Sequence, residues 1–302
     1  MRLATIDIGT NTTLLLVAEA SGRDVRVLVE RAEITRLGRG IGADGGLGRS
    51  GIERTLAVLT DYVAIARAQG ASIHAIGTEG LRRAPNAQDF LEPAGRILGA
   101  PVEVIDGDRE AALSFLAAQR SFPDETRGTA VVLDIGGGST EIIVARAEHV
   151  EFRRSLPMGS VRLTERHVRS DPATQAEVAA VTSEIVQQLS SVPFPSGPMT
   201  LIGTAGTVTT LAAMSLALTS YDPARVHGHR LTLAGLEQQI ARLQPSTQPE
   251  REKMAGLDPK RADVILAGAC ILRQITLLAH AVEILVSDRG IRWGLLFEKA
   301  MG

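Results

Sequence analysis

The chain has 302 residues, 44% of them hydrophobic, and a formal net charge of −2. A chain of this length buries about three quarters of the surface that its unfolded form exposes, usually in two domains. The small net charge gives no general attraction for polyanions, so an anionic ligand needs local groups. Only 3% of the residues are aromatic, which argues against base stacking and therefore against a nucleic-acid partner.

The apolar stretches do not indicate a membrane protein. Asp7 interrupts the first of them, which excludes a signal peptide. The most apolar window, residues 264–282, contains Arg273 and His280 and suits a buried helix better than a membrane span. Cys270 is the only cysteine, so no internal disulfide can form, and its apolar surroundings predict a core thiol. We therefore predict a cytoplasmic protein without a membrane partner.

The first 120 residues alternate between predicted strands and helices. Residues 3–17 indicate a strand, a polar turn and a second strand, and a third strand at 25–29 and a glycine-rich loop at 38–51 follow. Residues 38–43 of this loop superficially match a dinucleotide-binding fingerprint, but further glycines follow instead of a helix. The later alternation predicts a mostly parallel sheet covered by helices.

Two charged residues follow the predicted carboxyl ends of strands in this region. Arg82 comes after the strand at 73–77, and Glu110 comes after the strand at 102–105. Functional loops lie at this end of the strands in such sheets. The alternative for each residue is an ordinary surface salt bridge.

A polar, turn-rich segment at 122–128 marks the predicted domain boundary. We expect one domain at 1–126 and a second at 127–302. The terminal helix, at about 291–302, could return to pack on the first domain.

The second domain opens with a strand, a turn of three glycines and another strand. Asp134 and Glu141 bracket this turn, which consists of Gly136, Gly137 and Gly138 followed by Ser139 and Thr140. Consecutive glycines let backbone N–H groups approach a bulky anion closely. We therefore interpret residues 134–141 as a phosphate-and-metal loop, the alternative being a tight hairpin without a ligand.

This stretch has a partial copy at the N-terminus. Asp7 aligns with Asp134, and Gly9 aligns with Gly136 at the same offset. Two such copies, each opening one half of the chain, predict an internal duplication. Chance similarity between two short strands is the alternative.

A third glycine-containing turn lies at 203–207, between a predicted strand and a helix. Its Gly206 and Thr207 would place free N–H groups at the start of the helix, which favours an anion. A glycine-rich helix start without a ligand is the alternative. His227 and His229 have no third partner at a metal-ligand spacing, so we expect ordinary loop histidines.

Asp-x-Gly hairpins in duplicated α/β domains resemble the actin, sugar-kinase and heat-shock chaperone superfamily. Within it, the chain is similar to the exopolyphosphatase / guanosine pentaphosphate phosphohydrolase (Ppx/GppA) family over essentially its full length. Seven motifs in order carry the resemblance: residues 7–12, 77–86, 107–111, 134–141, 157–163, 203–207 and 287–295.

The resemblance implies two duplicated actin-like (ribonuclease H-like) ATPase-fold domains of the α/β class, with a cleft between them. It implies hydrolysis of the terminal phosphoanhydride of inorganic polyphosphate, with Mg²⁺ or another divalent cation such as Mn²⁺. The first alternative is hydrolysis of guanosine pentaphosphate (pppGpp) by the same residues. A non-catalytic phosphate or nucleotide sensor and an acceptor kinase of the same superfamily stay open, as does a homodimer.

The resemblance also implies roles for individual residues. Glu110 matches the general base that positions and deprotonates the attacking water, and Arg82 matches a phosphate-binding arginine. Asp134 and Glu141 match the acids around the metal. The residues that match phosphate-binding positions are Asp7, Thr10, Asn11, Thr12, Gly136, Gly137, Gly138, Ser139, Thr140, Gly206 and Thr207.

The chain departs from the family pattern in two respects. Arg109 stands where many relatives have an acid, so a cation beside Glu110 could strengthen polyanion binding or change the basicity of Glu110. The chain is also a short form without the C-terminal helical domain of long relatives. Processive action on long polyphosphate is therefore not expected unless a dimer extends the groove.

Overall fold

The computed structural model describes residues 1–21, 24–39 and 45–301. The chain forms two compact units, one of Met1–Ala117 with Ile291–Gly302 and the other of Ala118–Gly290. The first division falls inside helix α4 (Gly107–Ser121), and the second falls directly before helix α13 (Ile291–Met301). The domain boundary predicted between 126 and 127, and the predicted cleft, stay predictions. The glycine-rich run at 38–43 lies partly outside the described residues.

The first unit contains a mixed sheet of five strands in the order β3-β2-β1-β4-β5. Neighbouring strands β1, β2 and β3 are antiparallel, whereas β4 and β5 continue the sheet in parallel with β1. The strands are β1 (Arg2–Ile8), β2 (Thr13–Ser21), β3 (Asp24–Glu33), β4 (Ser72–Gly77) and β5 (Glu103–Val104).

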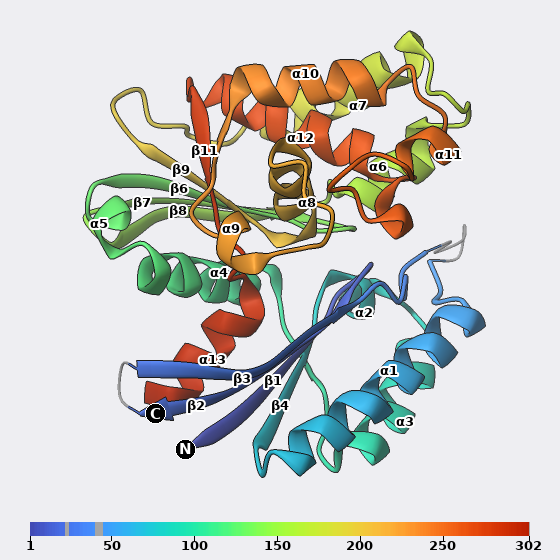
Figure 1. Ribbon diagram of the computed structural model, residues 1–302, viewed down its shortest axis with the longest axis vertical. Helices are drawn as coiled ribbons and strands as arrows, with labels where there is room; N and C mark the ends of the chain where they lie inside the picture. The colour runs from blue at the N-terminus through green and yellow to red at the C-terminus, as the bar shows by residue number, and fades with distance from the viewer. Residues whose placement is uncertain (22–23, 40–44, 302) are drawn as a thin grey trace. The chain divides into compact units, whose positions relative to one another are not determined.

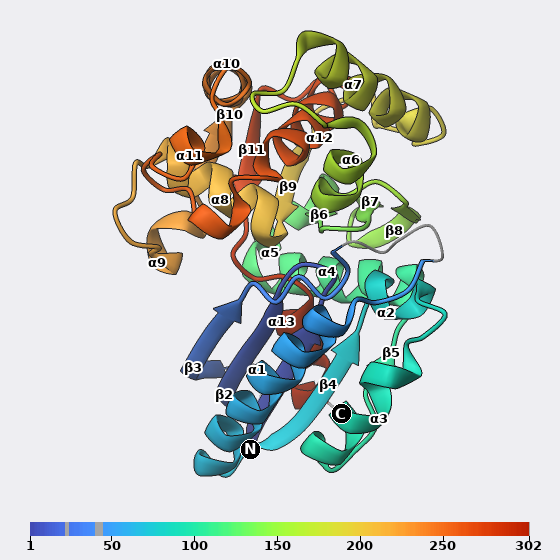
Figure 2. The same cartoon turned by 90° about the vertical axis from the view of Figure 1, so that its right-hand side faces the viewer.

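Helices cover both faces of this sheet because β1 alternates between two apolar sides. Ile6 and Ile8 face a core with α1 (Arg49–Ala68) and α3 (Gln88–Leu98), which pack side by side (Figure 1 and Figure 2). Leu3 belongs to a second core, in which Trp293 and Leu296 of α13 take part. The short helix α2 (Glu79–Arg83) follows β4 directly.

The second unit contains a sheet of six strands in the order β10-β11-β9-β6-β7-β8. The strands are β6 (Thr129–Ile135), β7 (Thr140–Arg146), β8 (His149–Leu156), β9 (Thr200–Thr204), β10 (Arg230–Thr232) and β11 (Glu283–Val286). The helices are α5 (Pro123–Arg127), α6 (Ser160–His167), α7 (Gln175–Leu189), α8 (Ala205–Ser215), α9 (Pro223–Val226), α10 (Leu233–Leu243), α11 (Gln248–Arg251) and α12 (Ile265–Leu278), with a 3₁₀ turn at Pro259–Arg261. One large core joins β6, β7 and β9 to α7, α8, α10 and α12, of which α7 and α10 each pack against α12 (Figure 1).

The two sheets share one topology, which confirms the predicted duplication and the α/β class. The order β3-β2-β1-β4-β5 is repeated as β8-β7-β6-β9-β11, with matching strand directions. The turns agree in detail: the N–H of Gly9 donates to the carbonyl of Thr12, and that of Gly136 donates to the carbonyl of Ser139, both at 3.0 Å. Each copy therefore positions a polar turn at the end of its first strand.

A second repeat, which the sequence analysis missed, follows the fourth strand of each copy. Gly77-Thr78-x-Gly80 extends from the end of β4 into α2, and Gly203-Thr204-x-Gly206 extends from the end of β9 into α8. The repeat covers only four residues, because the helices that follow differ in length and composition. It is recognised only once β4 and β9 are known to occupy equivalent places in the two sheets.

None of the described helices is long and apolar enough to cross a membrane. The apolar window that contains Cys270 forms the buried helix α12, as its polar interruptions predict.

We predict that the thiol of Cys270 is inert in the folded protein. It is buried in α12, and burial raises its pKa to about 11. Because a thiolate is the reactive species, a disulfide reagent at mildly alkaline pH should react at least about 10³-fold more slowly with native than with denatured protein. Cys270 is the only cysteine, so absorbance of the released thiol reports on it alone. Equal rates in the two states would contradict its placement in the core.

Candidate active site

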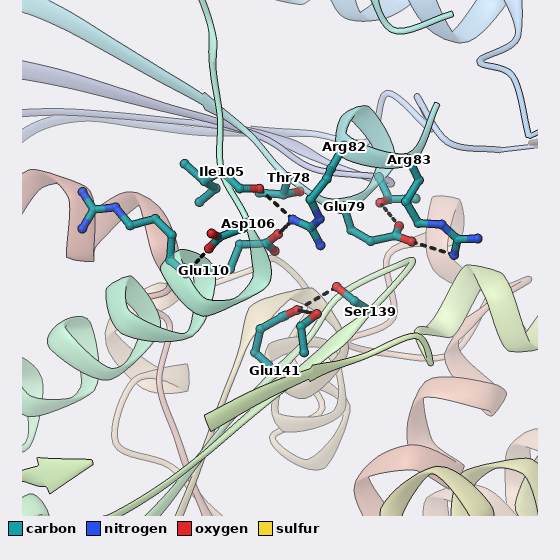
Figure 3. A network of polar contacts seen from close by, with 12 residues as sticks. Thr78, Glu79, Arg82, Arg83, Ile105, Asp106, Glu110, Ser139 and Glu141 are labelled. Atoms are coloured by element: carbon teal, nitrogen blue, oxygen red, sulfur yellow. Dashed lines mark hydrogen bonds and ion pairs between the residues drawn. The ribbon is translucent and has the colours of Figure 1, made fainter. Parts of the chain in front are cut away.

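Arg82 and Glu110, the two residues predicted to be catalytic, form an ion pair in the first unit (Figure 3). The same Nη1 nitrogen of Arg82 donates to the carbonyl oxygen of Ile105 at 2.7 Å and to Oε1 of Glu110. Glu110 is only 2% exposed, whereas about a quarter of the Arg82 side chain is exposed. A buried carboxylate is stable in its ionised form only with such a partner.

Local structure explains the position of Glu110. Asp106 directly precedes α4 and caps it: its side chain accepts the N–H of Arg109 at 2.8 Å and its carbonyl accepts the N–H of Glu110 at 3.0 Å. Glu110 therefore lies in the first turn of the helix, near the positive end of the helix dipole. An ionised carboxylate in this position is able to take a proton from a bound water.

The first polar turn presents backbone N–H groups in one direction. The carbonyl of Thr10 accepts the N–H of Gly38 at 2.8 Å, and the carbonyl of Asn11 accepts the N–H of Arg36 at 2.9 Å. In a trans peptide the N–H of the next residue points opposite to the carbonyl. The N–H groups of Asn11 and Thr12 therefore point away from the segment that holds the turn.

The side chains of this turn have different surroundings. The hydroxyl of Thr10 donates to buried Glu79 at 3.3 Å, so it is not available as a donor to a phosphate in this arrangement. The side-chain nitrogen of Asn11 is buried and makes no hydrogen bond within the described part of the chain. Asp7, at the end of β1, is 8% exposed. Sequence reasoning missed Glu79, because only the tertiary contact with Thr10 distinguishes it from a surface acid.

The glycine turn of the second unit is held through its carbonyl groups by the start of α6. The carbonyls of Gly136 and Gly137 accept the N–H groups of Ser160 at 3.0 Å and Val161 at 2.9 Å. The carbonyl of Gly138 accepts Nε of Arg162 at 2.7 Å. The carbonyl oxygens of all three glycines are therefore occupied by one helix end.

The same peptide geometry decides the direction of the following N–H groups. Those of Gly137, Gly138 and Ser139 point away from α6, because their preceding carbonyls point toward it. The N–H groups of Gly137 and Gly138 make no hydrogen bond to any residue that the structure describes. Gly159 packs so closely that an added Cβ would lie 2.4 Å from the carbonyl of Gly137. Three successive donors in a rigid turn are suited to bind an anion.

A row of polar side chains crosses the second sheet beside this turn. The strand register places Ser155, Glu141, Asp134 and Thr204 opposite one another on neighbouring strands. Asp134 and Glu141 are 4% and 1% exposed, and they lie on the same face of the sheet. The hydroxyls of Ser139 and Ser155 donate to Oε1 of Glu141 at 2.8 and 2.6 Å, and the contact with Ser139 is drawn in Figure 3.

The chemistry of this row fits a divalent cation. Two buried carboxylates on one face repel each other unless positive charge lies nearby. The hydroxyl of Thr204 is buried without a hydrogen-bond partner among the residues that the structure describes, and Gly290 leaves room beside Thr204 and Asp134. The described residues contain no cluster of three acidic, histidine or cysteine ligands. Mg²⁺ commonly binds through one or two carboxylates together with waters and substrate phosphates, which is the number of carboxylates in this row.

Arg261, a cation that the sequence did not predict at this site, lies beside the first turn of α8. The guanidinium of Arg261 lies across Gly206, where an added Cβ would be 2.4 Å from its terminal nitrogens. The absent side chain of Gly206 therefore makes space for this arginine at the start of the helix. The only signal in the sequence was a basic residue in the turn that precedes the apolar helix α12.

Two predicted phosphate-binding threonines have buried side chains. The hydroxyl of Thr140 donates to the carbonyl of Met158 at 2.6 Å and is completely buried, so it is not free for a phosphate. The two-residue period of the strand places it on the opposite face from Glu141. The methyl group of Thr207 packs against Gly268, and 3% of the residue is exposed.

We predict that Ala205→Gly stabilises the protein. Ala205 has a φ of 68°, a left-handed conformation that favours glycine over alanine. The free energy of unfolding should rise by about 0.5–1 kcal/mol, measured by denaturant titration. Ala212→Gly, in the same helix α8, is the matched control and should lower it by at least about 0.5 kcal/mol. A loss of stability in Ala205→Gly would show that this turn requires the alanine side chain.

Comparison with known proteins supports the resemblance noted above. Residues 16–301 match the model of the Ppx/GppA phosphatase family. Exopolyphosphatase 2 of Mycobacterium tuberculosis is 34% identical, over 99% of this chain and 98% of that protein. The structure of the Aquifex aeolicus PPX-GPPA enzyme covers 99% of both chains with 36% identity and a TM-score of 0.84. An exopolyphosphatase from Cytophaga hutchinsonii has a TM-score of 0.91 at 28% identity, over 99% of this chain and 98% of that one. This chain belongs to the Ppx/GppA phosphatase family and shares its hydrolase class and α/β fold.

Proposed function

We propose that this chain is an exopolyphosphatase, which hydrolyses the terminal phosphoanhydride of inorganic polyphosphate and releases orthophosphate. The observation that carries the proposal is the buried carboxylate of Glu110 in contact with Arg82. A protein that only senses phosphate needs no base, whereas hydrolysis needs a group that takes the proton of water. Full-length similarity to a protein named exopolyphosphatase supports polyphosphate as the substrate.

In the proposed reaction, Glu110 accepts a proton from a water molecule as its oxygen attacks the terminal phosphorus. The bond between that phosphorus and the bridging oxygen breaks, and the shortened polyphosphate leaves. Arg82 orients Glu110 and provides a positive charge for the phosphoryl oxygens. Phosphoryl transfer depends mainly on positioning and charge neutralisation, which this set of groups supplies.

The two polar turns bind phosphate oxygens through backbone N–H groups in this proposal. The donors are those of Asn11 and Thr12 in the first unit and those of Gly137, Gly138 and Ser139 in the second. Asp134 and Glu141 would hold Mg²⁺ or Mn²⁺, which neutralises phosphate charge when bound. Arg261 adds a cation at the start of α8, where a helix N-terminus also favours an anion.

Hydrolysis of pppGpp would use the same groups and is the alternative outcome. Parallel phosphate-release assays on polyphosphate and pppGpp separate the two. A tenfold higher kcat/KM for pppGpp, roughly 1.4 kcal/mol, would make pppGpp the substrate. Phosphate transfer from ATP that needs an added acceptor would instead identify a kinase, and binding without turnover would identify a sensor.

We predict that Glu110→Gln lowers kcat for polyphosphate roughly 10²–10⁴-fold, because the amide cannot accept the proton. Polyphosphate binding, measured by titration calorimetry, should stay within a few-fold of wild type. Glu92→Gln, an exposed acid on α3, is the matched control and should have normal activity. Near-normal hydrolysis by Glu110→Gln would remove Glu110 from the mechanism.

We also predict that Asp134→Asn raises the Mg²⁺ concentration for half-maximal activity, by an amount on the order of tenfold or more. The reason is the loss of one of two buried carboxylates on the same face. Asp61→Asn, an exposed acid on α1, should leave the Mg²⁺ dependence unchanged. An unchanged dependence in Asp134→Asn would place the cation elsewhere.

A further inference from the structure

Arg109, the residue next to Glu110, contacts the C-terminal helix of the same unit. Its Nη2 nitrogen donates to Oε1 of Glu298 in α13 at 2.5 Å. About a third of each side chain is exposed, 35% for Arg109 and 31% for Glu298, so the pair is partly shielded from solvent. The charge that distinguishes this chain near Glu110 therefore has a specific partner.

The ion pair lies about one helical turn from a close backbone contact between α4 and α13. Gly294 contacts the backbone of α4 so closely that an added Cβ would be 2.0 Å from the carbonyl of Leu113. Arg109 precedes Leu113 by four residues, and Glu298 follows Gly294 by four, which is about one turn on each helix. The ion pair therefore joins the two helices at a second point and restrains rotation of α4 about the contact between Gly294 and Leu113.

Several contacts attach helix α13 to the sheet of the first unit. The hydroxyl of Thr5 in β1 donates to the carbonyl of Arg292 at 2.9 Å. Nε1 of Trp293 donates to Glu30 of β3 at 3.0 Å, and the Trp293 ring is part of a buried core. Glu298 thus extends from an element whose position is already determined.

The first turn of α4, in contrast, lies at the end of a helix. The first N–H groups of a helix lack partners within the helix, and helix ends fray easily. Asp106 binds the N–H groups of Arg109 and Glu110. The hydrogen bond that Arg109 donates to Glu298 raises the pKa of Arg109, although partial burial opposes the shift, and the charges of Glu298, Glu103 and Asp106 raise it further. These three carboxylates offset the positive charge of Arg109, which therefore contributes little to the binding of a polyanion.

We propose that Arg109 and Glu298 are a positioning pair, which holds the first turn of α4 and thereby the carboxylate of Glu110 in the orientation required for proton transfer. The proposal rests on the proposed function, because only there does Glu110 act as the base. A displacement of about 1 Å at a reacting group lowers a rate by up to 10²-fold. The pair therefore affects kcat and leaves substrate binding unchanged.

The test compares Arg109→Gln and Glu298→Gln with the conservative variant Arg109→Lys, which keeps the positive charge opposite Glu298. Arg109→Gln and Glu298→Gln should each lower kcat about 10–100-fold with KM for polyphosphate changed less than about twofold, and Arg109→Lys should retain most of kcat. Arg26→Gln removes the partner of Glu19, an ion pair in the same unit, and should have normal kinetics. A higher KM in Arg109→Gln alone would show that Arg109 binds substrate, and would overturn the proposal.

Hydrogen exchange provides a readout that does not need activity. The amides of residues 109 and 110 should exchange faster in both Arg109→Gln and Glu298→Gln, and at the wild-type rate in Arg26→Gln. Unchanged exchange in the first two variants would overturn the positioning role. Normal kcat in these two variants, with Glu110→Gln inactive, would overturn the positioning role of Arg109 and Glu298 and leave the proposed function intact. A wild-type protein without hydrolase activity would overturn the proposed function itself.

Discussion

The carbonyl groups of the glycine turn at 136–138 are all bound by the start of α6, and this constraint determines what the turn can do. A peptide group cannot direct its carbonyl and the following N–H to the same side. Because the start of α6 binds these carbonyls, the N–H groups of residues 137–139 form a fixed set of donors on the side of the turn that faces away from α6. The turn at 9–12 follows the same rule, with Arg36 and Gly38 in place of α6.

The duplication explains why chemically different groups occur at equivalent places. Both copies have a polar turn after the first strand and a Gly-Thr-x-Gly turn after the fourth. In the first copy, Glu79 of the second turn binds Thr10, whereas Arg261 covers Gly206 in the second copy. Opposite Asp7 lies Leu14, but opposite Asp134 lies Glu141, so only the second copy has paired acids in register. Shared backbone geometry therefore supports divergent side-chain chemistry.

Much of the fold and part of the candidate site were predictable from local patterns. The strands, the duplicated hairpin and the buried helix around Cys270 all follow from periodicity and from glycine placement, which act over a few residues. The two-residue period of β7 directs the hydroxyl of Thr140 into the core, where it donates to the carbonyl of Met158, and the prediction from the turn's composition did not take that period into account. Arg261 and Glu79 were missed because their partners are distant in the sequence.

The sequence by itself determined the fold class, the duplication and the family, and it predicted candidate residues for phosphate binding. Only the tertiary structure decided which of these groups contact each other within each unit. Arg82 and Glu110 are 28 residues apart, and Arg109 and Glu298 are 189 residues apart. Hydrophobic and glycine patterns act through near neighbours in the chain, whereas such ion pairs exist only after the strands and helices that carry them have packed.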